Sequence, residues 1–386
     1  MRNLGRRGFA GALLFWIMPA ASAAGALALA PLLALCGAIG APWRFGGRIP
    51  LAYALLLAAA AWAALSVLWS PLDRPEQALK IVLATMAGLG LVAGMSGLDE
   101  KARGWVRASL LAGLLMLALL LAIEAGFDMP FNRAAQPETP TGLLQRNPGR
   151  GVFVLEALGF AGLAAALMLR GPPRWVFGAI LLAAMAALST QFSFDANLVA
   201  FAIGLAAFAL GYAAPRWAPA LAAGVWAFWL MAAPWVIHAA SGPLREAALQ
   251  LPPSWGMRLQ IWDYAAARAI EKPLLGWGLD ASRSFRDPQD LNGFTYAAIP
   301  LHPHSFSVQV WLETGGVGAL LLAASLAATG LACVRWCDGA RLPAAAATAC
   351  IATIGLVWNV SYGAWQEWYM ALPFMAAAAV LALKRA

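Results

Sequence analysis

The sequence is poor in charged residues, which make up 11% of its 386 positions, while 62% of the residues are hydrophobic. Soluble globular domains carry about 25% charged and about 45–50% apolar residues. The chain therefore has too few polar side chains to cover an apolar core with a hydrated surface. This shortage excludes a soluble globular enzyme, a disordered chain and a coiled coil, and it predicts an all-α polytopic transmembrane helix bundle.

Cysteine is also scarce, with four residues in the chain. All four fall within apolar runs or on the side predicted to be cytoplasmic, so no external disulfide is expected; they are Cys36, Cys333, Cys337 and Cys350. Neither a His nor a second Cys pair lies near Cys333 and Cys337, which argues against a zinc site. We therefore expect no metal and no cofactor.

Apolar runs long enough to cross a bilayer dominate the rest of the sequence. We predict twelve spans, at 8–21, 24–40, 50–69, 78–97, 105–126, 151–169, 174–190, 195–213, 217–237, 305–333, 342–360 and 367–385. The first two are short and nearly continuous, so 8–40 could instead form one long tilted helix. The basic residues before the first run resemble a signal peptide, but further spans follow at once, and we interpret 8–21 as a retained helix.

The distribution of basic residues decides between these alternatives. With twelve spans and both termini cytoplasmic, most of the 26 Lys and Arg residues fall on cytoplasmic segments, as the positive-inside rule requires. An eleven-span arrangement would place Arg2, Arg6 and Arg7 outside. The net charge of +8 therefore reports topology, and the expected contacts are membrane lipids rather than nucleic acid.

Two longer segments are predicted on the external side of this single membrane domain, 1–386. They are 127–150 and 238–304, the second of which joins the ninth and tenth predicted spans. Six basic residues in the second segment are balanced by six acidic ones. Any anion site there must therefore depend on local geometry rather than on a general positive charge.

The stretch 255–271 places apolar residues at helical spacing and predicts an amphipathic helix along the membrane surface. Ser254 is the expected N-cap, and Pro273 ends the helix. Arg258 then falls in the first turn, where a cation opposes the helix dipole. An anionic partner would offset this cost, although a solvated or headgroup-facing Arg explains the spacing equally well.

All three His residues lie on the external side, at the two ends of the segment 238–304. Histidine is the usual general base near neutral pH because its unperturbed pKa is about 6.5. For the isolated His238, an interfacial position without chemistry is the simpler interpretation. His302 and His304 lie at the mouth of a span and are candidates for a catalytic role. A metal site with two His ligands is possible there, but the spacing offers no third ligand.

Acidic residues in or near the spans map toward the outer half of the membrane: Glu124, Glu156, Asp195, Glu313 and Glu367. Carboxylates in a membrane are candidates for function, although pairing with a nearby Arg is an adequate structural explanation. The glycine-rich stretches 276–278 and 315–318 lack the strand–turn–helix context of a nucleotide-binding loop. They predict a turn and close helix packing.

The stretches 258–285 and 302–322 resemble the O-antigen ligase and polymerase superfamily of bacterial envelope membrane proteins. In that pattern an external helix with Arg and Trp precedes a Pro-Leu-x-Gly-x-Gly turn, and a His-x-His-Asn stretch then leads into a helix with Glu and Gly-x-x-Gly. The matching positions here are Arg258, Trp262, Pro273, Leu274, Gly276, Gly278, His302, His304, Glu313, Gly315 and Gly318. The remainder of the chain agrees with the family only in its topology.

This resemblance implies an inverting, metal-independent glycosyltransferase of the bacterial inner membrane that takes a glycan from undecaprenyl diphosphate. Ligases move the glycan to lipid A–core, polymerases move it to another repeat unit, and other relatives move it to protein Ser or Thr. By resemblance, His304 is the catalytic base and Arg258 binds the diphosphate. His302 and Glu313 are expected to bind substrate.

Two positions depart from the family pattern. Ser305 stands where Asn is usual, and the turn at 190–198, which often carries Ser-Arg-Gly, has Asp195 and no Arg. Arg146 or Arg150 could supply the missing charge, and both are expected with Asp195 at the substrate site. We predict an O-antigen ligase, with an O-antigen or exopolysaccharide polymerase as the first alternative and a transporter or flippase for lipid-linked glycans as a more distant one.

Overall fold

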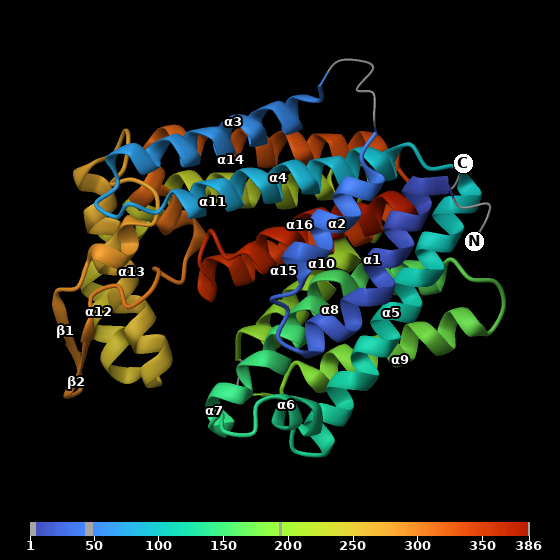
Figure 1. Cartoon of the computed structure of the whole chain (residues 1–386), viewed down its shortest axis with the longest axis horizontal. Helices are drawn as coiled ribbons and strands as arrows, with labels where there is room; N and C mark the ends of the chain where they lie inside the picture. The colour runs from blue at the N-terminus through green and yellow to red at the C-terminus, as the bar shows by residue number, and fades with distance from the viewer. Residues whose placement is uncertain (1–4, 43–48, 193–194, 385–386) are drawn as a thin grey trace.

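The computed structural model describes residues 5–42, 49–192 and 195–384, and nearly all of this chain is helical (Figure 1). The only sheet among the described residues is an antiparallel pair, β1 (Pro288–Leu291) and β2 (Phe294–Ala297). The all-α bundle predicted from the sequence is confirmed.

Every one of the twelve predicted spans is occupied by a helix. These are α1 (Gly5–Ala23), α2 (Leu29–Gly40), α3 (Leu51–Leu65) with η1 (Ser66–Trp69), α4 (Pro75–Ser96), α5 (Glu100–Gly126), α8 (Arg146–Leu167), α9 (Pro173–Leu188), α10 (Asp195–Ala213), α11 (Ala218–Ala239), α14 (Phe306–Cys337), α15 (Arg341–Val360) and α16 (Glu367–Ala382). Helices α3, α4, α11 and α14 run along the longest axis of the molecule, whereas α1, α5 and α8 are inclined to it (Figure 1). Within the described ranges, eight helices are long and apolar enough to cross a membrane, and α2, α9 and α16 are shorter apolar helices. The chain is a multi-pass membrane protein.

The first two predicted spans form a helical hairpin, not one long helix. Gly25 (φ +109°) and Ala26 (φ +66°) turn the chain between α1 and α2. Near the other end of the hairpin, the Arg6 guanidinium donates a hydrogen bond of 2.5 Å to the Ala41 carbonyl oxygen. The two helices are therefore antiparallel.

Helix α8 is the centre of the core, with every residue from Gly151 to Ala166 buried. Its glycines allow neighbouring helices to approach closely, as is usual for helices that pack in lipid. A Cβ atom added at Gly162, for example, would lie 2.4 Å from the Leu114 side chain of α5. This close packing fixes α8, which also carries Arg150 near its first turn.

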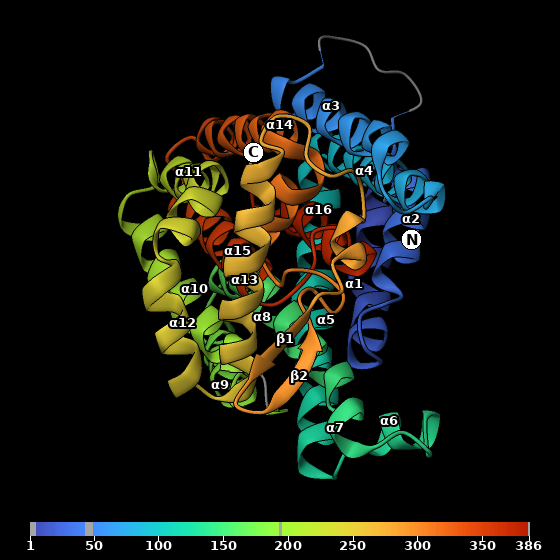
Figure 2. The same cartoon turned by 90° about the vertical axis from the view of Figure 1, so that its left-hand side faces the viewer.

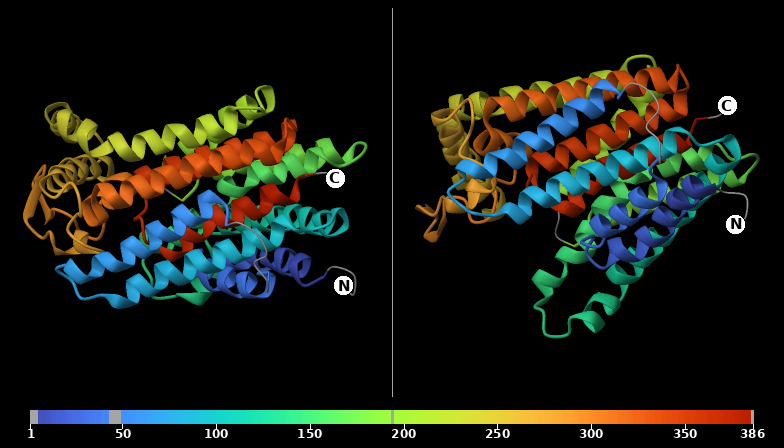
Figure 3. Two further views of the ribbon diagram at one scale, coloured as in Figure 1. Left: turned by 90° about the horizontal axis from the view of Figure 1, so that it is seen from above. Right: turned by 45° about the horizontal axis from the view of Figure 1, so that its top comes forward.

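One end of the bundle is covered by chain that does not run along the long axis. Figure 2 shows α12 (Ser241–Gln250), α13 (Pro253–Glu271) and the β1–β2 hairpin crossing this end, which we call the site end. The turn η2 (Ala281–Ser284) lies between α13 and the hairpin, while α6 (Pro130–Ala135) and α7 (Thr141–Leu144) precede α8. Helix α1 begins and α16 ends away from the site end (Figure 3).

The start of α13 differs from the sequence prediction. The helix begins at Pro253 with Pro252 as N-cap, so the prediction of Ser254 as the cap is wrong. Proline suits the first helical position because its fixed φ is already helical and its missing N–H would have no partner there. Arg258 consequently lies in the second turn, while the predicted end before Pro273 is confirmed.

Candidate active site

His302 and His304 lie side by side at the site end, immediately before α14. Their ring centroids are 4.2 Å apart. His302 is 6% exposed, whereas His304 is partly exposed. His304 has a φ of +55°, in the left-handed region that few non-glycine residues adopt. This turn brings its backbone N–H to 3.2 Å from His302 Nδ1, so the backbone sets the relative position of the two rings.

The orientation of the His304 ring is fixed by one further contact. Nδ1 lies 2.7 Å from the Ser361 carbonyl oxygen. A carbonyl oxygen can only accept, so Nδ1 carries the hydrogen and donates it. The lone pair of the neutral ring is then on Nε2, which is the nitrogen left to take up a proton.

Both imidazoles are neutral at pH 7. Burial lowers the pKa of His304 to about 4; the hydrogen bond to the Ser361 carbonyl acts against this, and the positive charge of Arg258 adds to it. Burial also lowers the pKa of His302 well below its usual value; protonation of His304 would act in the same direction, as do the charges of Arg283 and Arg258. A neutral ring can accept a proton, so this environment keeps His304 in the basic form.

Three arginines from separate elements act on this region. The charge of Arg258 on α13 lowers the pKa of both histidines, and that of Arg283 in η2 lowers the pKa of His302. Burial raises the pKa of Tyr362, and the charges of Arg150 and Arg258 oppose this effect. The site therefore combines neutral histidines with cationic groups, an arrangement suited to a neutral nucleophile and an anionic leaving group.

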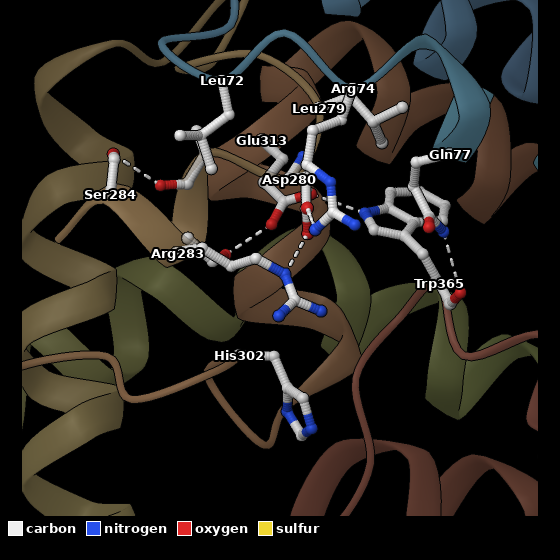
Figure 4. Close-up of polar contacts among 12 residues, drawn as sticks. Leu72, Arg74, Gln77, Leu279, Asp280, Arg283, Ser284, His302, Glu313 and Trp365 are labelled. Atoms are coloured by element: carbon white, nitrogen blue, oxygen red, sulfur yellow. Dashed lines mark hydrogen bonds and ion pairs between the residues drawn. The ribbon is translucent and has the colours of Figure 1, made fainter.

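Arg283 is held in place by Asp280, which is itself paired with Arg74. Its Nε donates to Asp280 Oδ1 at 2.8 Å, and Arg74 Nη1 donates to the other carboxylate oxygen at 2.7 Å. Figure 4 shows the Arg283 side chain extending from Asp280 toward His302. In the sequence, Arg283 is one of the six basic residues that six acidic ones balance in the segment 238–304. The Asp-x-x-Arg spacing directly after the glycine turn is the sequence feature that could have identified Arg283 as part of the site.

Glu313 is completely buried, and both of its carboxylate oxygens accept hydrogen bonds from other residues of the protein. One oxygen accepts hydrogen bonds from Ser282 Oγ and from Gln309 Nε2 (3.0 Å). The other accepts from the Asp280 backbone N–H (2.8 Å) and from Trp365 Nε1 (2.5 Å). Glu313 was predicted to bind substrate, but here it joins α14 to η2 and to the segment that follows α15.

The two glycine-rich stretches pack against each other. The Gly278 N–H donates to the Glu313 carbonyl oxygen (2.9 Å), beside a kink in α14 at Gly315, where φ is +64°. A Cβ atom at Gly278 would lie 2.4 Å from Ser70 Cα. The predicted turn and close packing are confirmed, and they explain why glycine is needed at these positions.

The segment 361–366 between α15 and α16 supports the site from the other side. Ser361 orients His304, as described above, and the Gln366 side-chain amide lies 3.0 Å from His302 Nε2. The Ala364 N–H donates to Gln309 Oε1 at 2.8 Å. This segment, which we call the support loop, therefore contacts both histidines and the Glu313 network.

The remaining predicted residues are less closely tied to the His pair. Arg146 is exposed at the start of α8, and Arg150 is partly exposed one turn later. Asp195 is the first residue of α10, and its side chain lies outside the described residues. Across the described ranges, no three His, Cys, Asp or Glu side chains gather as a potential metal site.

Glu313→Gln is expected to lower the free energy of unfolding by about 1–3 kcal/mol, because an amide NH2 replaces one acceptor oxygen and leaves buried donors unpaired. The unfolding temperature of the purified protein measures this change. Glu367→Gln is the matched control: Glu367 pairs with Lys80 at 2.9 Å, but the two side chains are 38% and 50% exposed, so loss of this ion pair should matter little. An unchanged unfolding temperature in Glu313→Gln would contradict the proposed structural role.

Comparison with known proteins agrees with this geometry. Residues 195–323 match the family described as O-Antigen ligase. This stretch includes α13, the glycine turn, the His pair and Glu313. Residues 195–323 are thus similar to the O-antigen ligase family. The resemblance stated from the sequence is confirmed for this part of the chain.

Three Rickettsia proteins with the provisional name polysaccharide ligase are each similar to about a third of this chain. The one from Rickettsia conorii is 34% identical over 131 residues, covering 33% of this chain and 31% of the relative. Those from Rickettsia typhi and Rickettsia felis are 29% and 30% identical over 133 and 131 residues, each covering 33% of this chain and 32% of the relative. The match thus spans about a third of the length of these relatives. No solved structure gives a significant match.

Proposed function

We propose that this chain is a membrane glycosyltransferase of the O-antigen ligase type, which transfers a glycan from undecaprenyl diphosphate to lipid A–core. The observation that carries the proposal is the neutral His304 ring, with Nε2 free to accept a proton and the charge of Arg258 close by. The match to the O-antigen ligase family supports the same reaction class. A polymerase would use the same chemistry with a glycan acceptor.

The reaction in this proposal is a single displacement. The acceptor hydroxyl oxygen forms a bond to the anomeric carbon while the bond from that carbon to the diphosphate oxygen breaks. The hydroxyl proton passes to His304 Nε2, and the bonding electron pair leaves with the diphosphate. Attack from the face opposite the leaving group inverts the anomeric configuration.

Arginine side chains stabilise the diphosphate as its negative charge develops. Guanidinium groups suit this role because they stay cationic and bind phosphate oxygens in a bidentate manner. We assign it to Arg258 and to Arg283, whose charges both act on His302. Arg150 supplies a third charge on the Tyr362 side and compensates for the Arg that the family often carries near 193. Arg146 and Asp195 remain predictions for the rim of the site.

The donor and acceptor set the location of this chemistry. A lipid-linked glycan requires a site at a membrane surface, and a bulky glycan requires an aqueous compartment. We therefore propose that the site end is periplasmic, that the protein lies in the bacterial inner membrane, and that both termini are cytoplasmic. The twelve helices and the excess of basic residues on the opposite side support this arrangement.

The test is transfer by the purified full chain in detergent, with lipid-linked glycan as donor. Lipid A–core and free lipid-linked repeat units are offered separately as acceptors. Glycosylated lipid A–core supports a ligase, and a lengthened glycan chain supports a polymerase. Because detergent removes the sealed compartment, any product excludes transport as the sole activity. Failure to form product with both acceptors, while donor binding persists, would contradict a transferase.

The pH profile offers a separate prediction. Protonated His304 cannot act as a base, and its pKa is about 4. Activity, as kcat/KM, is therefore expected to stay constant from about pH 7 to pH 5 and to fall as the pH drops through about 4. An ordinary exposed histidine would give a fall near pH 6.5. A fall centred there would contradict the buried neutral base.

A further inference from the structure

A cavity of about 670 Å³ opens at the end of the bundle opposite the His pair. Helix α14 connects the two ends: it starts beside His304, and its last residue, Cys337, lines the cavity. The other walls come from the ends of α8, α10 and α16 and the starts of α9 and α15, which meet at the right of Figure 1. The cavity is therefore separate from the candidate active site.

Four cations line this cavity: Arg170, Arg174, Arg341 and Lys384. Asp338 is the single acidic residue among the lining side chains. Within the part of the chain that the structure describes, none of the four cations forms an ion pair. Their charge is therefore available to an anion.

The cations are held at the depth expected for the membrane interface. The Arg341 guanidinium lies 5.4 Å from the Tyr212 ring centroid, and Lys384 Nζ lies 4.7 Å from the Trp336 ring centroid. Tyrosine and tryptophan prefer the level of the lipid headgroups. The same cavity also has an apolar wall, made by Leu167, Leu342, Pro343 and Leu383.

We propose that this cavity binds the headgroup phosphate of an anionic phospholipid, with the adjoining part of the acyl chains against the apolar wall. Topology alone requires basic residues somewhere on this side, but it does not require four of them around one cavity. A free phosphate would use the cations and gain nothing from the leucines and the proline. Basic pockets between membrane helices are known to suit anionic lipid headgroups.

The test titrates the purified full chain in detergent with phosphatidylglycerol or with phosphatidylcholine and counts bound lipid by native mass spectrometry. Phosphatidylglycerol should bind preferentially. Arg170→Gln combined with Arg341→Gln should weaken that binding about fivefold for each charge removed. Arg133→Gln combined with Arg268→Gln is the matched control, because it removes two arginines that lie outside this cavity. The control should bind phosphatidylglycerol as the unchanged protein does.

Two further arms make the result decisive. Arg170→Lys combined with Arg341→Lys keeps the charge and should retain phosphatidylglycerol binding. If the Gln double variant does not fold, the single variant Arg174→Gln replaces it, and a fivefold loss of binding is expected. Millimolar inorganic phosphate should not displace the lipid. Equal binding of both lipids, no loss in the Gln variants, or displacement by phosphate would each overturn the assignment.

Discussion

His304→Ala is expected to lower the rate of glycan transfer by about 100- to 10,000-fold, the usual range for loss of a general base. Donor binding should change little, because the diphosphate is assigned to the arginines. The expectation depends on the tautomer: Nδ1 donates to the Ser361 carbonyl, and only Nε2 can take the acceptor proton. Turnover of purified protein in detergent and binding of the lipid-linked donor are measured separately.

His238→Ala is the matched control for that variant. His238 lies in the last turn of α11, is exposed, and is the third histidine of the chain. Its replacement should leave both turnover and donor binding unchanged. If His304→Ala retained near-normal turnover, the assignment of the base would be wrong, whatever the behaviour of the control.

Arg258→Gln is expected to lower kcat/KM by about 100- to 1,000-fold, because a charged donor to the developing diphosphate is lost. Arg258→Lys should also be impaired, by about 10- to 100-fold. Lysine keeps the charge but lacks the planar fork that binds two phosphate oxygens at once. Steady-state kinetics with varied donor concentration measure both effects.

Arg268→Lys provides the control on the same helix. Arg268 pairs with Glu271 at 2.8 Å near the end of α13 and lies over the Tyr264 ring; among the described residues it forms no ion pair with either histidine. Its conservative replacement should leave kcat/KM unchanged. Full activity in Arg258→Lys would show that the fork geometry is not used, and full activity in Arg258→Gln would remove Arg258 from the site.

The fold was predictable because it follows from long apolar runs, which can cross a bilayer only as helices whose backbone groups are paired internally. The predictions differed from the structure where one residue decides the outcome. Helix α13 begins at Pro253, earlier in the chain than predicted, so Ser254 lies inside the helix and not at its cap. By contrast, the separate spans predicted at 8–21 and 24–40 are confirmed by the turn at Gly25 and Ala26; the basic residues, not apolar length, indicated this division.

The site was predictable only in part, because its supports come from distant parts of the chain. His302 and His304 stand out in the sequence because histidine is rare in this chain and only Pro303 separates the two. The position of Arg283 depends on Asp280, which is fixed in turn by Arg74, 206 positions away in the sequence. Sequence spacing does not reveal such a contact. The hydrogen bonds that hold Glu313 could not be predicted for the same reason, since Trp365 lies 52 positions away.

The support loop determines which part of the chain must be present for the histidines to be correctly oriented. Residues 361–366 orient His304 and contact His302, yet they lie outside the matched stretch 195–323. A fragment ending with α14 would keep both histidines, Arg258 and Arg283 but would lose the carbonyl that selects the reactive nitrogen. Exchange of the segment from α15 to α16 between relatives would therefore replace the residues that contact both histidines without changing any residue of the matched stretch.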